Sequence, residues 1–188
     1  MTERRPAPSL HPLLARRWSP TAFDPLAEVS EDDVETLLEA ARWSPSAGNS
    51  QPWAFVVGRR GDPTHARLVA HLAPSTRRWA PAAGVLVANL AHRYVEGTDW
   101  EYSEFALYDL GQAVAHMTVQ ALALGLHVRQ FRAFDREGIA EEFAVPRHWE
   151  VTTMSAIGRA ARTPAPPASP AGLPGSRERR GGLRWPTV

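Results

Sequence analysis

The residues best suited to chemistry lie in one nine-residue segment, residues 45–53, which reads Pro-Ser-Ala-Gly-Asn-Ser-Gln-Pro-Trp. Its two prolines each remove a backbone donor and fix φ, and Gly48 allows backbone conformations that a side chain would forbid. The expected result is a stiff bend that groups Ser46, Asn49 and Gln51, whose side chains form hydrogen bonds without carrying charge. Such a set suits a flat heteroaromatic ligand with alternating carbonyls and ring nitrogens. The same composition is also typical of an ordinary loop.

The neighbours of this segment extend the pattern. A Leu-Leu-Glu-Ala-Ala-Arg helix precedes it at residues 37–42, and a strand at residues 55–57, Phe-Val-Val, follows it. In this helix–loop–strand context, Pro-Ser-x-x-Asn-x-Gln-Pro-Trp resembles the FMN-binding loop of the nitroreductase family. The resemblance covers roughly residues 13–160. It implies that the flavin is contacted by Pro45, Ser46, Ala47, Asn49 and Gln51.

A second segment, Arg16-Arg17-Trp18-Ser19, places two cations beside a hydroxyl. Arginine supplies paired donors to phosphate, although an isolated basic pair is usually solvated. The segment resembles the family's N-terminal motif Arg-x-Ser-x-(Arg/Lys)-x-Phe, with Thr21 where a basic residue is common. The resemblance implies flavin contacts from Arg16 to Ser19, with the phosphate on Arg17 and Ser19. A C-terminal Arg-rich segment reaches the same phosphate in the family, and the residues that match it approximately are Arg177 and Arg179.

Two further segments resemble flavin-contacting parts of the family. Residues 75–83 match a segment near the pyrimidine edge, where Ser75 and Arg78 are the candidates; a cation there favours the anionic reduced flavin. Residues 126–135 run from a strand into a bend that precedes a helix at residues 136–143. The resemblance places Gln130, Phe131, Arg132 and Ala133 beside the flavin, with the backbone N–H groups of Arg132 and Ala133 facing N5. The family often has an acidic residue and a glycine at these last two positions.

Composition limits the classes of function. The chain has 188 residues, a formal net charge of +1 and no cysteine, so charge gives no drive toward nucleic acid or membranes. Any redox chemistry must therefore come from a bound cofactor, and we expect no metal site. No run approaches the ~20 apolar residues that span a bilayer, and residues 1–12 do not read as a secretory signal, so we expect a cytoplasmic protein. No Gly-x-Gly-x-x-Gly occurs, which disfavours a dinucleotide-binding domain.

The order of predicted elements indicates an α+β fold. Apolar runs predict strands at 55–57, 84–90 and 151–157, and a spacing of three and four predicts a long helix through Leu107, Leu110, Val114, Met117, Ala121 and Leu124. The resemblance implies a small, mostly antiparallel sheet flanked by helices, with this long central helix at a homodimer interface. We expect a flexible arm at 1–12, an FMN-binding domain at 13–160 and a Pro/Arg-rich extension at 161–188. Residues 92–105 read as a variable substrate-side loop.

The resulting hypothesis is an FMN-dependent oxidoreductase that passes hydride from NAD(P)H through flavin N5 to an electron-poor acceptor by a ping-pong mechanism. Acceptors of this kind are nitroaromatics, quinones and activated alkenes. No side chain is assigned as an obligatory acid or base, and His116 is interpreted as a core or interface histidine because no carboxylate or nucleophile lies beside it in sequence. Two alternatives stay open: a flavin-binding or storage protein without turnover, and a specialised biosynthetic dehydrogenase or dehalogenase on the same scaffold.

Overall fold

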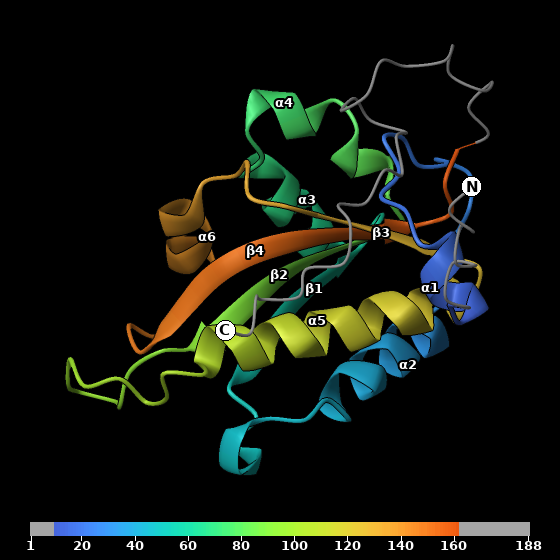
Figure 1. Ribbon diagram of the computed structural model, residues 1–188. Helices are drawn as coiled ribbons and strands as arrows, with labels where there is room; N and C mark the ends of the chain where they lie inside the picture. The colour runs from blue at the N-terminus through green and yellow to red at the C-terminus, as the bar shows by residue number, and fades with distance from the viewer. Residues whose placement is uncertain (1–9, 162–188) are drawn as a thin grey trace, which may run out of the picture.

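A four-stranded antiparallel sheet in the order β1-β2-β4-β3 forms the centre of the molecule (Figure 1). We describe a computed structural model, which places residues 10–161. The strands are β1 Trp53–Arg59, β2 Val85–His92, β3 His127–Phe131 and β4 Trp149–Gly158. All but the last residue of β2 are buried, as expected of an inner strand. The predicted α+β fold with an antiparallel sheet is confirmed.

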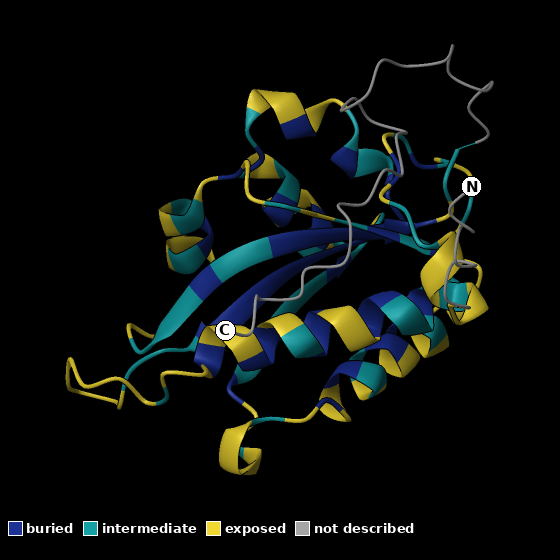
Figure 2. Cartoon of the chain, viewed as in Figure 1, coloured by how far each residue is buried: buried dark blue, intermediate teal, exposed yellow. Residues whose placement is uncertain are grey.

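Helices cover both faces of this sheet (Figures 1 and 2). The alternation of β2 explains the two layers, because Val85 and Val87 pack with α2 (Glu31–Arg42) and α5 (Ala106–Ala123), whereas Leu86 and Ala88 face the opposite core. That second core includes residues of α3 (Pro63–Ala70) and α6 (Arg136–Glu142). The shorter helices are α1 Pro12–Arg16, η1 Ala47–Asn49, α4 Pro74–Arg77 and η2 Ala80–Ala82.

Helix α2 begins at a reciprocal capping box formed by Ser30 and Asp33. The Ser30 hydroxyl accepts the N–H of Asp33 at 3.0 Å, and the Asp33 carboxylate accepts the N–H of Ser30 at 3.1 Å. This reciprocal capping box satisfies two donors that a helix terminus otherwise leaves unpaired. The helix buries Val34, Leu37 and Ala41, and it delivers the chain to the turn before β1.

Helix α5 matches the predicted long helix, with one error in its buried face. Leu110, Val114, Met117 and Ala121 are buried as expected, but Leu107 is 41% exposed. The buried face of the first turn is instead formed by Ala106 and the carboxylate Asp109. In the described range, residues 10–161, no helix is long and apolar enough to cross a membrane.

The connector between β2 and α5 is irregular, as the sequence predicts. Its residues are mostly exposed, including Trp100 at 77%, and its regular pairing is a single bridge between Tyr94 and Glu101. Its role on the substrate side stays a prediction, as do the three proposed chain divisions.

Candidate functional site

The turn at Arg132–Ala133 follows β3 and is held rigidly from one side. The carbonyl of Ala133 accepts the hydroxyl of Thr76 at 2.7 Å and the N–H of Ala73 at 3.2 Å. Phe134 N–H donates to the carbonyl of Arg132 at 3.0 Å. These contacts join the turn to the segment around α4, so the candidate residues 75–78 and 130–133 lie next to each other.

The outer side of the same turn has unused donors. Within residues 10–161, the backbone N–H groups of Arg132 and Ala133 donate to no acceptor, and both residues are exposed. Backbone N–H groups are strong donors that natural structures usually satisfy. Because the carbonyl side of the turn is fixed, these two N–H groups form a prepared site for an acceptor atom of a ligand.

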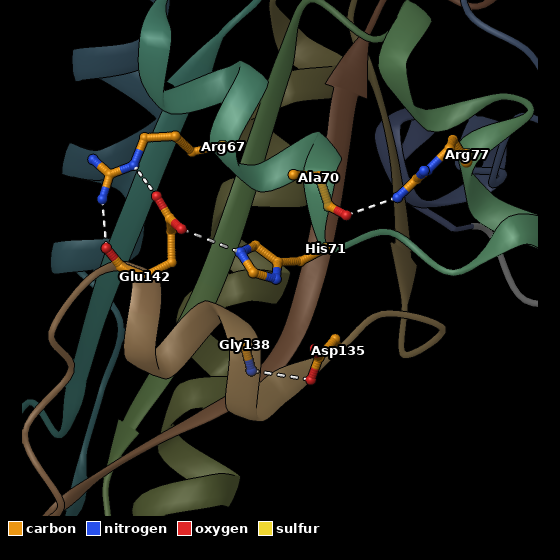
Figure 3. Close-up of polar contacts among 7 residues, drawn as sticks. All are labelled: Arg67, Ala70, His71, Arg77, Asp135, Gly138 and Glu142. Carbon is orange, nitrogen blue, oxygen red and sulfur yellow. Dashed lines mark hydrogen bonds and ion pairs between the residues drawn. The ribbon is translucent and has the colours of Figure 1, made fainter.

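Helices α3 and α6 hold the end of this turn in place (Figure 3). Asp135 caps α6 by accepting the N–H of Gly138 at 3.0 Å, and its own N–H donates to the carbonyl of His71 at 2.9 Å. On the last turn of α6, Glu142 pairs with Arg67 at 2.6 Å and lies 3.7 Å from His71. The Arg67 hydrogen bond lowers the pKa of Glu142, so this contact between the helices persists into mildly acidic conditions.

Uncompensated positive charge gathers along the β3 edge. Arg17 donates to the Ser19 hydroxyl at 3.4 Å, and Arg129 donates to the adjacent Pro20 carbonyl at 3.1 Å. The guanidinium of Arg129 also lies 4.5 Å from the ring centroid of Trp79, the residue that follows Arg78 in sequence. In the part of the chain that the structure describes, none of the following forms an ion pair with a carboxylate: Arg17, Arg78, Arg129 and Arg132. An anionic ligand would supply the missing countercharge.

Aromatic contacts tie these segments together. Trp18 meets His127 of β3 edge to face, with ring centroids 5.3 Å apart, and Trp79 meets Phe131 in the same way at 5.2 Å. Burial lowers the pKa of His127, so this histidine adds no charge near neutral pH. Gln130 donates to the hydroxyl of Thr118 on α5 at 3.4 Å.

Two of the predicted residues have a different setting from the rest. Arg16 is the last residue of α1, not part of an extended segment, and its Nε donates to the Pro12 carbonyl at 3.3 Å. Ser75 is exposed in the short helix α4. The neighbouring Thr76, which sequence reasoning missed, anchors the turn instead. The predicted phosphate contacts Arg177 and Arg179 lie outside the described residues.

Residues 45–51, which we call the polar loop, form the second group of candidates. Gly48, Asn49 and Gln51 have φ of 59°, 54° and 47°, a left-handed conformation that glycine and asparagine tolerate best. The Ser46 hydroxyl accepts the N–H of Gln51 at 3.0 Å, and the Gln51 amide donates to the Asn49 carbonyl at 3.2 Å. The structure therefore brings together the three neutral polar side chains that the sequence singled out.

The polar loop and the Arg132–Ala133 turn lie apart in one chain. Ala47 N–H donates to Asp109 in the first turn of α5, whereas Gln130 contacts Thr118, nine residues further along that helix. Nine residues correspond to about 14 Å of helix. The polar loop precedes β1 and the Arg132–Ala133 turn follows β3, and these two strands are the opposite edges of the sheet (Figure 1). A single chain thus carries two half-sites: an arginine-rich half-site at β3 and a neutral half-site in the polar loop.

His116 is exposed on α5 and lines a shallow groove with Trp43 and Thr36 of the α2 side. The core interpretation of this histidine is therefore wrong, and the interface interpretation stays a prediction. In the described range, residues 10–161, no group of three or more His, Asp or Glu side chains could hold a metal ion.

Comparison with known proteins identifies the scaffold. Residues 14–85, which contain the Arg17–Ser19 pair and the polar loop, match the model of the nitroreductase family. A solved structure described as an oxidoreductase containing FMN superposes with a TM-score of 0.76 at 29% identity, covering 84% of this chain and 80% of that one. The chain therefore resembles the nitroreductase family in sequence over residues 14–85, and its fold is that of an FMN-containing oxidoreductase.

Individual relatives show the same resemblance. The chain is 27% identical over 165 residues to a Streptomyces coelicolor protein named as an NADH dehydrogenase/NAD(P)H nitroreductase, covering 77% of this chain and 81% of that protein. It is 46% identical over 50 residues to the major NAD(P)H-flavin oxidoreductase of Aliivibrio fischeri. That second match spans 25% of this chain and 23% of the Aliivibrio enzyme.

Proposed function

We propose that this protein is an FMN-dependent oxidoreductase that takes electrons from NAD(P)H and delivers them to an electron-poor acceptor by a ping-pong mechanism. The acceptor classes are nitroaromatics, quinones and activated alkenes. The observation that carries the proposal is the Arg132–Ala133 turn, whose two N–H groups have no acceptor among residues 10–161 while Thr76 and Ala73 fix its carbonyl side. Because such an enzyme needs a supply of NAD(P)H, the proposal favours a cytoplasmic location.

The described residues fit FMN in charge and in donor chemistry. Arg17 and Ser19 would hold the phosphate, because two donors already converge there without a carboxylate nearby. Arg78 would lie at the pyrimidine edge, where a cation stabilises the reduced, anionic ring. The N–H groups of Arg132 and Ala133 would donate to flavin N5. When bound, FMN supplies the hydride chemistry that these side chains lack.

The protein's own part is to bind, orient and exclude water. Fixed N–H donors are effective because they need no reorganisation when a ligand arrives. No described side chain at either half-site is placed as an obligatory acid or base, so protons for the acceptor would come from solvent. We therefore expect rates to depend on positioning more than on a single titrating residue.

A homodimer would complete the site. The two half-sites lie apart in one chain, and the polar loop of one subunit would meet the arginine-rich half-site of its partner. Exposed apolar side chains support this arrangement, because Tyr108 is 68%, Trp43 73% and Leu107 41% exposed. Exposed groups of this kind mark interaction surfaces when they are contiguous.

The test is an absorption spectrum of the purified protein, or of protein reconstituted with FMN, followed by anaerobic NADPH or NADH. Flavin bands near ~370 and ~450 nm that bleach with a nucleotide and return with a nitroaromatic or quinone would support the proposal. Parallel double-reciprocal plots would support the ping-pong order. Bound FMN that neither nucleotide reduces would contradict it and favour a binding protein without turnover.

A further inference from the structure

The single carboxylate of α5, Asp109, is buried, with 2% of its surface exposed. A buried carboxylate is costly unless donors satisfy its oxygens. One oxygen, Oδ2, accepts the N–H of Ala47 at 3.0 Å, and Oδ1 accepts the side-chain amide of Gln112 at 3.2 Å. One of these two hydrogen bonds therefore comes from the polar loop, and Asp109 keeps it only while the loop stays in place.

Gln112 adds a second contact between α5 and the polar loop, on the N-terminal side of Ser46. It lies one helical turn after Asp109, so both side chains project from the same face of α5. Its amide nitrogen approaches the Pro45 carbonyl at 3.5 Å. Two side chains of one rigid helix thus hold the loop backbone at residues 45 and 47.

The loop needs external support of this kind. Asn49 and Gln51 are non-glycine residues in the left-handed region, with Gly48 just before them. Such conformations persist when the surroundings over-determine them, and they cluster at ligand-binding sites. The internal bonds of the loop join Ser46 to Gln51, but they do not fix its position relative to the sheet.

We propose that Asp109 is a positioning residue that fixes the polar loop before the flavin binds, and so sets flavin affinity without touching the cofactor. This inference rests on the proposed function. The direct contact is Asp109 to the Ala47 N–H, and Ser46, Asn49 and Gln51 act on the ligand. Because preorganised groups bind without an ordering cost, loss of the carboxylate weakens FMN binding more than it weakens the fold.

A matched control distinguishes positioning from ordinary capping. Asp62 also accepts two backbone N–H groups, from Arg59 at 2.8 Å and from His65 at 2.6 Å. It caps α3, on the opposite face of the sheet from α5. Replacement of Asp62 removes a comparable pair of hydrogen bonds at the N-terminal end of α3, whereas the contacts that hold the Arg132–Ala133 turn come from its C-terminal end.

The experiment uses the full chain and measures three quantities: the FMN dissociation constant from flavin fluorescence, the thermal midpoint, and amide hydrogen exchange of the FMN-free protein. We expect Asp109→Ala to raise the dissociation constant about 10- to 100-fold, the usual effect of a misplaced binding group. Asp109→Asn keeps an acceptor for Ala47 and restores most of the affinity. Asp62→Ala lowers the thermal midpoint and leaves the dissociation constant unchanged. Exchange at residues 47–51 accelerates in Asp109→Ala alone.

A second variant covers the case in which Asp109→Ala does not fold. Ala47→Pro removes the N–H from the loop side; residue 47 opens η1, and Ser46 is already extended at φ −147° and ψ 154°, as a residue before proline must be. It has the same expected loss of FMN affinity.

Three results overturn the inference. The first is an unchanged FMN dissociation constant in Asp109→Ala or, where that variant does not fold, in Ala47→Pro. The second is an equal loss of FMN affinity in Asp109→Asn and Asp109→Ala. The third is unchanged amide exchange at residues 47–51. Wild-type protein that fails to bind FMN would instead contradict the proposed function, and the exchange data would still decide whether Asp109 fixes the loop.

Discussion

Replacement of Thr76 by valine isolates the bond that fixes the Arg132–Ala133 turn. Thr76 is 4% exposed, and its hydroxyl lies 2.7 Å from the Ala133 carbonyl. Valine has nearly the same shape but no donor, and the carbonyl keeps the N–H of Ala73 at 3.2 Å. One lost hydrogen bond costs about 1 kcal/mol, and the exposure of Ala133 to water keeps the cost near this value. For a chain of this size, that lowers the thermal midpoint by about 2–4 °C.

The assay compares Thr76→Val with Thr36→Val in urea unfolding of the FMN-free protein and in anaerobic flavin reduction by NADPH. Thr36 is exposed on α2, and its hydroxyl donates to the Asp32 carbonyl at 2.7 Å, so it controls for the loss of a threonine hydroxyl. We expect Thr76→Val to slow flavin reduction roughly tenfold, because a donor aimed at N5 loses its alignment, and Thr36→Val to leave it unchanged. Equal reduction rates in Thr76→Val and wild type would refute the role given to this turn.

Burial lowers the pKa of His65, His92 and His127, so the folded state binds fewer protons than the unfolded state, and stability falls as the pH drops through the unfolded value of ~6.5. Urea midpoints at several pH values between 7.5 and 5.5 test this, and a flat profile would count against it. Tyr108→Glu should dissociate the proposed dimer in sedimentation velocity and weaken FMN binding with it; a monomer that keeps full affinity would exclude a shared site. Arg78→Gln should lower the reduction potential of bound flavin by roughly 30 mV for each tenfold loss of preference for the reduced form, and an unchanged potential would remove Arg78 from the ring.

Local sequence signals predicted most of the fold because their causes are local. Ser30 and Asp33 cap α2 through contacts three residues apart, and the nearly continuous apolar run from Val85 to Leu90 is an inner strand. The conformation of Gly48 follows from the bend between two prolines. Each of these features depends on spacing or residue type, which a single sequence displays.

Features that depend on tertiary contacts were not predictable in this way. Thr76 and Asp109 act across 57 and 62 residues of sequence, and neither has a distinguishing local pattern. The spacing of three and four in α5 includes Leu107 in the apolar stripe, because periodicity cannot show that the carboxylate of Asp109 takes the inner face of the first turn. The position of Arg129 in the arginine-rich half-site depends on its contact with Trp79, which the sequence does not show. The roles of Arg177 and Arg179 stay predictions.

The central claim is that one flavin site combines the arginine-rich half-site of one subunit with the polar loop of its partner. Two variants separate these halves: Arg17→Glu removes a phosphate donor, and Gly48→Val strains the loop at φ +59°, where no neighbouring atom lies within 4 Å of an added Cβ. Each variant alone should bind little FMN. Unfolded together and refolded as a mixture, they should recover about a quarter of the wild-type sites, because half of the dimers are mixed and each mixed dimer has one intact site. A mixture that binds no more FMN than either variant would place both halves in one chain and contradict the account.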